Sequence, residues 1–198
     1  MSTSKPFAEI IESSLQTFTG QCWAWDNSPQ FGSLVIVENG LKPIFGLVYQ
    51  IQTGSMEPGR YPFPYQKTHA ELMAEQPQIF EFLKTSFSCL ALGYQEKGKI
   101  HYLMPPEPPK IHSFLALASD EHNRAFFAKN SYLPLLFGYS GPINIDELLL
   151  ALLKGQNDQK SLKNDSLNDF INTYSLLTGS DYRRLKLFLS RVENIVLK

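Results

Sequence analysis

The sequence lacks most of the signatures that would identify a protein's chemistry directly. It has two cysteines and no C-x-x-C spacing, so neither a zinc ribbon nor a thioredoxin-type redox site is predicted. No stretch approaches the ~20 apolar residues of a membrane-spanning helix. The formal net charge of −1 provides no overall attraction to nucleic acid or to an anionic membrane.

The N-terminal segment and the cysteines favour a cytoplasmic protein. Residues 1–18 contain two glutamates and no long apolar core, which argues against a signal peptide. Cys22 and Cys89 each lie in an apolar, strand-like run, as is typical of buried thiols in a reducing compartment. Their spacing leaves a disulfide open. We therefore expect a cytoplasmic protein without a membrane segment.

Catalytic motifs are also missing. Gly93 to Lys99 matches G-x-x-x-x-G-K, but Ile100 stands where a phosphate loop needs serine or threonine, and the run is predicted to form a β-hairpin. No H-E-x-x-H or G-x-S-x-G occurs. We predict no enzyme activity, no metal and no cofactor. An unrecognised enzyme is a second alternative, in which Cys22 or Cys89 would act as a nucleophile together with a histidine. The four histidines are His69, His101, His112 and His122, and they show no metal-binding spacing.

What the sequence does contain is enough apolar material for a sizeable core, with 43% hydrophobic residues. Short β-branched and aromatic runs separated by turn residues predict strands. One reversal is expected at Asn39-Gly40, and Gly46 inside a strand indicates a bulge or a barrel corner. The predicted strands are residues 17–24, 33–38, 43–54, 86–96, 99–104 and 110–118.

An insertion rich in proline and aromatic residues interrupts the β pattern. Thr68 and Glu71 form a predicted capping box for a helix that ends near Gln76, and a second short helix is expected from Gln78 to Lys84. In the preceding loop, Tyr61, Phe63 and Tyr65 alternate with prolines. Such a loop either docks a partner, for which aromatic side chains are favoured anchors, or packs as a lid over one open end of a barrel.

After residue 118 the apolar period lengthens toward 3.6, which predicts helices. Ser119 is expected to cap a helix over residues 120–129, and Asn144 a helix that runs to Lys154. A polar linker is predicted at residues 155–165. Ser166 and Ser180 are then expected to cap the last two helices, with Gly179 ending the first of them; each carries one apolar stripe.

The last helix also has a basic side. Residues 154–198 hold eight lysines or arginines and five acids, against ten and fourteen in the rest of the chain. The basic side is either an ordinary solvated face or a nucleic-acid contact, although it offers few charges for a duplex. Its members are Arg183, Arg184, Lys186 and Arg191.

Strands first and helices last favour an α+β fold. We predict a small antiparallel β-barrel of about six strands in residues 1–118, with a helical insertion near 67–84. A C-terminal helical region follows in residues 119–198.

The predicted strand region resembles the HAS-barrel, the small β-barrel shared by HerA-type helicases and the catalytic subunits of rotary ATP synthases. The resemblance spans about residues 15–155. Its motifs, which are degenerate, are Gly20, Gly46-Leu47-Val48, Leu90-Ala91-Leu92-Gly93, the proline-rich Pro105 to Pro109, Tyr132-Leu133 and the leucine-rich Leu148 to Leu153. In that family the barrel usually precedes a large ATPase domain.

ATP hydrolysis is not carried over from the resemblance, because this chain has no valid phosphate-binding motif. The insertion at residues 55–84 is a further departure. What the resemblance implies is the barrel's part in contacts between subunits or with a partner. We therefore expect a non-catalytic module for protein–protein contact or assembly, accessory to a larger complex or self-associating, with Tyr61, Phe63 and Tyr65 as partner-binding residues. A nucleic-acid-associated module is the alternative.

Overall fold

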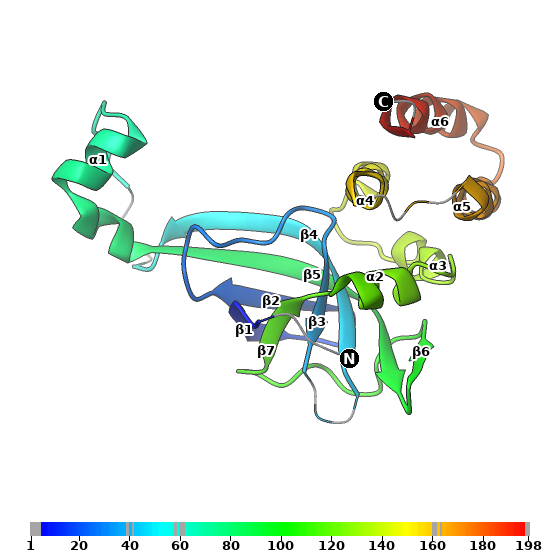
Figure 1. Ribbon diagram of the computed structural model, residues 1–198, viewed down its shortest axis with the longest axis horizontal. Helices are drawn as coiled ribbons and strands as arrows, with labels where there is room; N and C mark the ends of the chain where they lie inside the picture. Colours follow the sequence, from blue (N-terminus) through cyan, green and yellow to red (C-terminus); the bar gives the residue numbers. More distant parts are fainter. Residues whose placement is uncertain are drawn as a thin grey trace.

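Six antiparallel strands close into a β-barrel in the computed structural model, which describes residues 5–38, 40, 42–57, 59, 62–159, 162 and 164–196 (Figure 1). The order around the barrel is β1-β7-β3-β4-β5-β2, and β1–β2 pairing closes the ring. β6 (Lys99–His101) pairs with β5 and lies outside the ring. The barrel strands are β1 (Ala8–Ser13), β2 (Thr17–Cys22), β3 (Leu34–Val37), β4 (Ile44–Ser55), β5 (Leu83–Glu96) and β7 (Phe114–Leu117).

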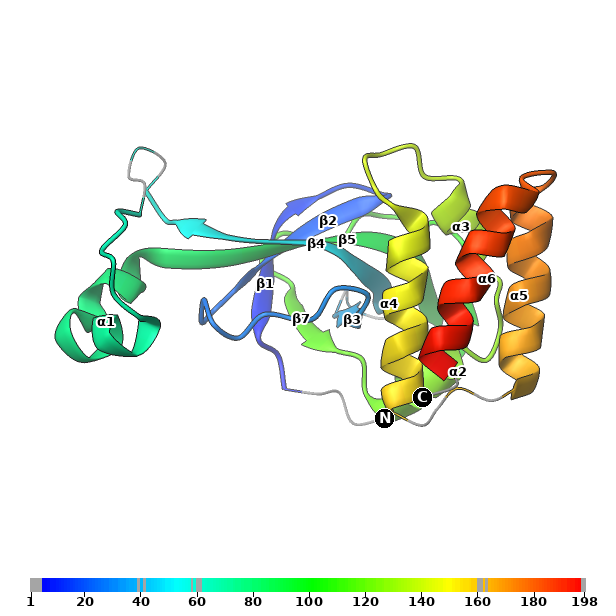
Figure 2. The ribbon, with the colours of Figure 1, turned by 90° about the horizontal axis from the view of Figure 1, so that it is seen from above.

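The helices lie in two places: one group covers one side of the barrel, and the other lies at the end of the long β4–β5 hairpin (Figure 1). α4, α5 and α6 lie side by side, with α6 contacting both of the others (Figure 2). α1 and the 3₁₀ helix η1 lie at the opposite extremity. The helices are α1 (His69–Glu75), η1 (Pro77–Phe82), α2 (Asp120–Phe126), α3 (Leu133–Phe137), α4 (Ile145–Asp158), α5 (Asn164–Thr178) and α6 (Tyr182–Val196).

The α+β fold with a barrel of six strands is confirmed, but the strand set differs in two places. β1 was not predicted: only Ala8 and Ile10 of its residues are buried, and Glu9 and Glu12 interrupt the apolar pattern. The predicted strand at residues 99–104 ends at His101 and forms no part of the ring. β1 takes its place in the barrel by pairing with β2 and β7.

The predicted helix starts are confirmed where a side chain caps the helix. Thr68 and Glu71 form the complete capping box of α1, and the side chains of Ser119 and Asn144 accept hydrogen bonds at the starts of α2 and α4. The helix expected from Gln78 to Lys84 is instead a 3₁₀ helix with proline at its start, and Lys84 belongs to β5.

Three further expectations about the helices are wrong. α4 runs to Asp158, so it includes the first residues of the expected polar linker at 155–165. α5 begins at Asn164, before the expected cap at Ser166. At the start of α6 the carboxylate of Asp181, rather than Ser180, accepts a hydrogen bond from the Arg184 amide (3.0 Å). α3 was not predicted, because its apolar residues surround a proline and show no period.

The described buried apolar residues form two clusters, one inside the barrel and one between the outer face of its wall and the helices. In β3, Val35 and Val37 belong to the cluster inside the barrel, whereas Leu34 and Ile36 pack with the helices. Successive side chains of a strand point to opposite faces, so this short strand is buried on both sides. The helices α4, α5 and α6 therefore share one cluster with the outer face of the barrel. The domain boundary at residue 118 stays a prediction.

Gly46 tests how tightly the barrel interior is packed. It lies at a register shift of the β4–β5 pairing, as the bulge prediction requires, and an added Cβ would stand 2.2 Å from Cζ of the buried Phe18. We expect Gly46→Ala to lower the free energy of unfolding by about 1–3 kcal/mol through overpacking. Gly54→Ala in the same strand is the control, since nothing lies within 4 Å of its Cβ position. Equal urea midpoints for both variants would contradict this packing.

Candidate functional site: the hairpin arm

β4 and β5 continue beyond the barrel as a two-stranded arm. β3 pairs with β4 only as far as Leu47, and β2 pairs with β5 from Ser86 onward. The remaining pairs, Thr53–Thr85 to Ser55–Leu83, have no third strand beside them in the described part of the chain. We call residues 50–88 the hairpin arm and residues 56–82, at its end, the arm tip; Figure 1 shows the tip far from the barrel opening.

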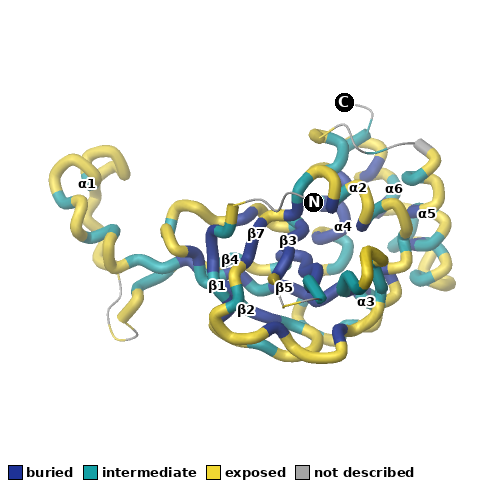
Figure 3. The backbone as a smooth tube through the Cα atoms, turned by 60° about the horizontal axis from the view of Figure 1, so that its bottom comes forward, coloured by how far each residue is buried: buried dark blue, intermediate teal, exposed yellow. Residues whose placement is uncertain are grey.

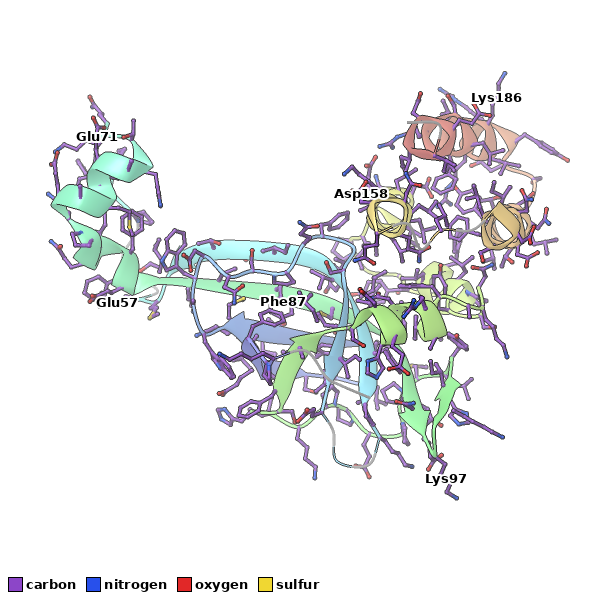
Figure 4. The ribbon with its side chains drawn as sticks, viewed as in Figure 1. Glu57, Glu71, Phe87, Lys97, Asp158 and Lys186 are labelled. Atoms are coloured by element: carbon purple, nitrogen blue, oxygen red, sulfur yellow. The ribbon has the colours of Figure 1, made fainter. Side chains whose placement is uncertain are left out.

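The arm tip is held by local interactions instead of a core. Neither α1 nor η1 contains a buried residue, and Figure 3 shows the tip as an exposed segment. The capping box satisfies the first amides of α1, and its hydrogen bonds from the Thr68 backbone and side chain lower the pKa of Glu71. Lys67 pairs with Glu75 across the same helix. In Figure 4, Glu71 lies on the outer side of the tip.

An aromatic cluster around Trp25 joins the tip to the barrel. Trp25, in the loop between β2 and β3, stacks on Phe80 with ring centroids 5.4 Å apart and lies 5.9 Å from the ring of His69. The Trp25 carbonyl accepts a hydrogen bond from the hydroxyl of Thr85 on the arm. These contacts orient the arm relative to the barrel and leave the rest of the tip exposed.

The tip presents apolar side chains to solvent. Phe63 is 71% exposed and Tyr65 39%, and their rings meet edge to face at 5.7 Å. Met56, Met73 and Phe82 are exposed as well. Beside them runs a groove of about 520 Å³ whose lining is mainly apolar. Its walls are Ser55, Pro62, Phe63, Tyr65, Leu72, Gln76, Gln78, Ile79, Phe80, Phe82 and Leu83.

The predicted partner-binding residues are thus placed as follows. Tyr61 lies outside the described residues. Phe63 and Tyr65 lie together on the tip and line the groove. The alternative in which this loop covers one end of the barrel is wrong, because β4 and β5 carry the tip away from the barrel before the loop begins (Figure 1).

The basic side of α6 is partly neutralised within the protein. Arg184 donates hydrogen bonds to both oxygens of the Asp146 carboxylate, the shortest at 2.7 and 2.9 Å, and the Tyr174 hydroxyl donates another to the same carboxylate at 3.0 Å. Burial and the hydrogen bond to Asp146 raise the pKa of Tyr174 above its ordinary value. Arg191 pairs with Glu147. Both acids stand in the first turn of α4, where a helix favours negative charge.

Because two of the four basic residues are already paired, we expect no tight nucleic-acid binding. Anisotropy titrations with labelled single- and double-stranded DNA and RNA at low salt should show no sub-micromolar affinity. Arg183→Glu with Arg184→Glu should change nothing measurable in these titrations. Sub-micromolar binding with a steep salt dependence, lost in that variant, would favour the nucleic-acid alternative.

The run that resembles a phosphate loop is a hairpin. Glu96 pairs with Lys99, and Gly98 (φ 78°) turns the chain between β5 and β6. Lys97 lies at the tip of this turn in Figure 4, with no helix following it. We expect phosphate release from ATP to equal the background and to be unaffected by Lys99→Ala. Turnover abolished by that substitution would contradict the assignment.

The cysteines and histidines form no shared site in the described part of the chain. Cys22 and Cys89 are buried free thiols, and burial raises the pKa of Cys22 to about 11 and that of Cys89 well above its ordinary value. His101 is on β6 and His112 precedes β7, and these strands are not paired. Among residues that the structure describes, no three His, Cys, Asp or Glu side chains are grouped to hold a metal.

No described helix is both long and apolar enough to cross a membrane. Comparison of the chain with models of known protein families and with curated proteins finds no match. The geometry of the arm is therefore the basis for the functional proposal.

Proposed function

We propose that this chain is a non-catalytic β-barrel module that binds another protein through its hairpin arm, as an accessory or assembly subunit of a larger complex. The observation that carries the proposal is the arm tip: two helical segments without one buried residue, surrounded by exposed aromatic and methionine side chains. A partner would supply the core that the tip lacks.

The energetics of the tip support a docking role. α1 has seven residues, and helices of that length are marginal in water unless packing stabilises them. Pro62 and Pro64 restrict the backbone around Phe63, so the ring is held in place at low entropic cost on binding. Large aromatic side chains held in this way are the usual anchors of protein interfaces.

The HAS-barrel resemblance supports the same proposal. A closed barrel of six antiparallel strands followed by helices agrees with it. We propose that the barrel takes the part it has in that family, contact between subunits, with the arm as this chain's addition. Two unpaired, buried thiols agree with the reducing cytoplasm as the compartment in which the chain works.

The proposal is tested by removing the tip without disturbing the barrel. Gly54 and Lys84 form a hydrogen-bonded pair, so residues 55–83 can be replaced by Asn-Gly as a two-residue turn. Affinity capture from the native host should recover a partner with the intact chain and lose it with this tip-less variant. A double variant of an exposed pair on the barrel, Trp23→Ala with Phe114→Ala, should retain the partner.

Light scattering on the purified chain separates the two kinds of partner. Dissociation of a dimer in the tip-less variant would assign the arm to self-association. A partner captured equally by the intact and tip-less chains would show that the docking surface lies elsewhere.

A further inference from the structure

The outer edge of β4 along the arm is an unpaired strand edge. Its last described backbone hydrogen bonds to the barrel are two with the loop before β3: Val48 N donates to the Ser33 carbonyl (3.0 Å), and Gly32 N donates to the Val48 carbonyl (2.8 Å). Beyond Val48 no described strand or loop hydrogen-bonds to this edge. Figure 1 shows β4 as the outermost strand of the arm.

The β4–β5 register identifies which backbone groups are unpaired. Met56 N donates to the Phe82 carbonyl (2.8 Å), so residues 56, 54, 52 and 50 direct their amides and carbonyls toward β5. Consecutive residues of a strand alternate in this direction. Ile51, Thr53 and Ser55 therefore direct theirs outward, which leaves three donors and three acceptors along one line.

This edge lacks the features by which proteins usually protect exposed strands. Residues 50–55 are Gln-Ile-Gln-Thr-Gly-Ser, with no proline and no charge. The side chains of Gln50, Gln52 and Thr53 are exposed. The one irregularity, a register shift between Val48 and Gln50, lies where the edge begins, and leaves the rest regular.

The edge leads directly into the apolar groove of the tip. Ser55, its last outward residue, also lines that groove, together with Phe63 and Tyr65. A strand paired with β4 would thus place its following side chains against those aromatic rings. In Figure 1 the tip lies beyond one end of this edge and the α4–α6 helices lie beyond the other.

Resting on the proposed docking function of the arm, we propose that the partner binds by strand addition. An extended, uncharged segment of the partner pairs with Ile51, Thr53 and Ser55 of β4 and places a large apolar side chain in the groove. Main-chain hydrogen bonds then supply affinity, and the groove supplies selectivity for one side chain.

The probe is a set of fluorescein-labelled seven-residue peptides of alternating threonine and valine that end in phenylalanine, leucine, alanine or lysine. In anisotropy titrations, the phenylalanine peptide should bind at least about tenfold more tightly than the lysine peptide. N-methylation of alternate amides gives two peptides, of which one should lose binding and the other keep it, because only one side of a strand faces β4.

Thr53 offers a matched pair of protein variants. Thr53→Pro removes one outward amide and leaves the β4–β5 hydrogen bonds intact. It should lower the affinity for the phenylalanine peptide at least about tenfold. Thr53→Val loses the same side-chain hydrogen bond to Thr85 (2.7 Å) but keeps the backbone amide. Its affinity for the phenylalanine peptide should be within about twofold of that of the wild type. Urea midpoints of the two variants show whether both are folded.

Three results would overturn strand addition: no saturable binding of any peptide up to about 1 mM, equal effects of the two methylation patterns, or equal effects of proline and valine at Thr53. A dimer that Thr53→Pro dissociates would assign the edge to a second copy, which also contradicts the inference. If capture of a partner requires the tip but is unaffected by Thr53→Pro, the docking function is supported and strand addition is wrong.

Discussion

Replacing Phe126 with alanine is expected to lower the free energy of unfolding by about 3–5 kcal/mol, the usual cost of deleting a fully buried aromatic ring. Phe126 is 0% exposed and lies on α2 between the barrel and the helices. Its ring centroid lies 4.9 Å from that of Phe45 on β4 and 5.8 Å from that of Tyr132. Its carbonyl accepts a hydrogen bond from the Tyr102 hydroxyl (2.6 Å).

Urea denaturation followed by circular dichroism measures this effect. Because one cluster joins the helices to the barrel wall, we expect strand and helix signals to shift together in the Phe126→Ala variant. Phe63→Ala is the size-matched control, since that ring is exposed on the tip. An unshifted midpoint, or loss of the helical signal alone at lower urea, would contradict a core shared between the two regions.

The second large effect is expected on partner binding. Phe63→Ala with Tyr65→Ala should weaken the complex by about 1,000-fold, because aromatic anchors at an interface commonly contribute about 2 kcal/mol each and every 1.4 kcal/mol changes the affinity tenfold. The unfolding free energy should stay within about 0.5 kcal/mol of wild type, since neither side chain is buried. Isothermal titration against the captured partner and a parallel urea titration give the two values.

A double variant on the opposite side of the molecule controls for general loss of apolar surface. Leu176 on α5 and Tyr182 at the start of α6 are 83% and 77% exposed. Leu176→Ala with Tyr182→Ala should leave the affinity unchanged. A greater loss of affinity in this variant than in the arm variant would move the interface to the helices, where Lys186 points outward (Figure 4).

The elements that were predicted correctly have local signals. The capping box at Thr68 and Glu71 and the cap at Asn144 depend on residues within one helical turn. Gly179 has the positive φ (60°) expected after the end of α5. The single apolar stripes of α5 and α6 meet each other through Phe170, Tyr174 and Phe188, as their period predicts.

The elements that were missed depend on pairing between distant residues. β1 shows few apolar positions, and its place is set by pairing with β7, about a hundred residues away. The pairing of Asp146 with Arg184 joins residues 38 apart, so the basic side of α6 looks more charged in the sequence than it is in the fold. The periodicity of apolar residues in the sequence does not reveal pairing between such distant residues.

The candidate site was predicted in composition but not in geometry. The alternation of prolines with Phe63 and Tyr65 identified the loop, because aromatic side chains are favoured anchors at protein interfaces. Whether the loop closes the barrel or leaves it depends on how far β4 and β5 extend past their neighbours. The free edge at Ile51, Thr53 and Ser55 follows from that same difference in strand length, with the uncharged run as its only sequence signal.

Hydrogen–deuterium exchange of the chain with and without its captured partner tests the docking role of the arm most directly. The account predicts slower exchange in the complex at the outward amides of Ile51, Thr53 and Ser55 and across residues 62–82, with the barrel interior unchanged. Protection confined to α6 or to the barrel wall around Trp23 and Phe114, with exchange of the arm unaltered, would contradict it.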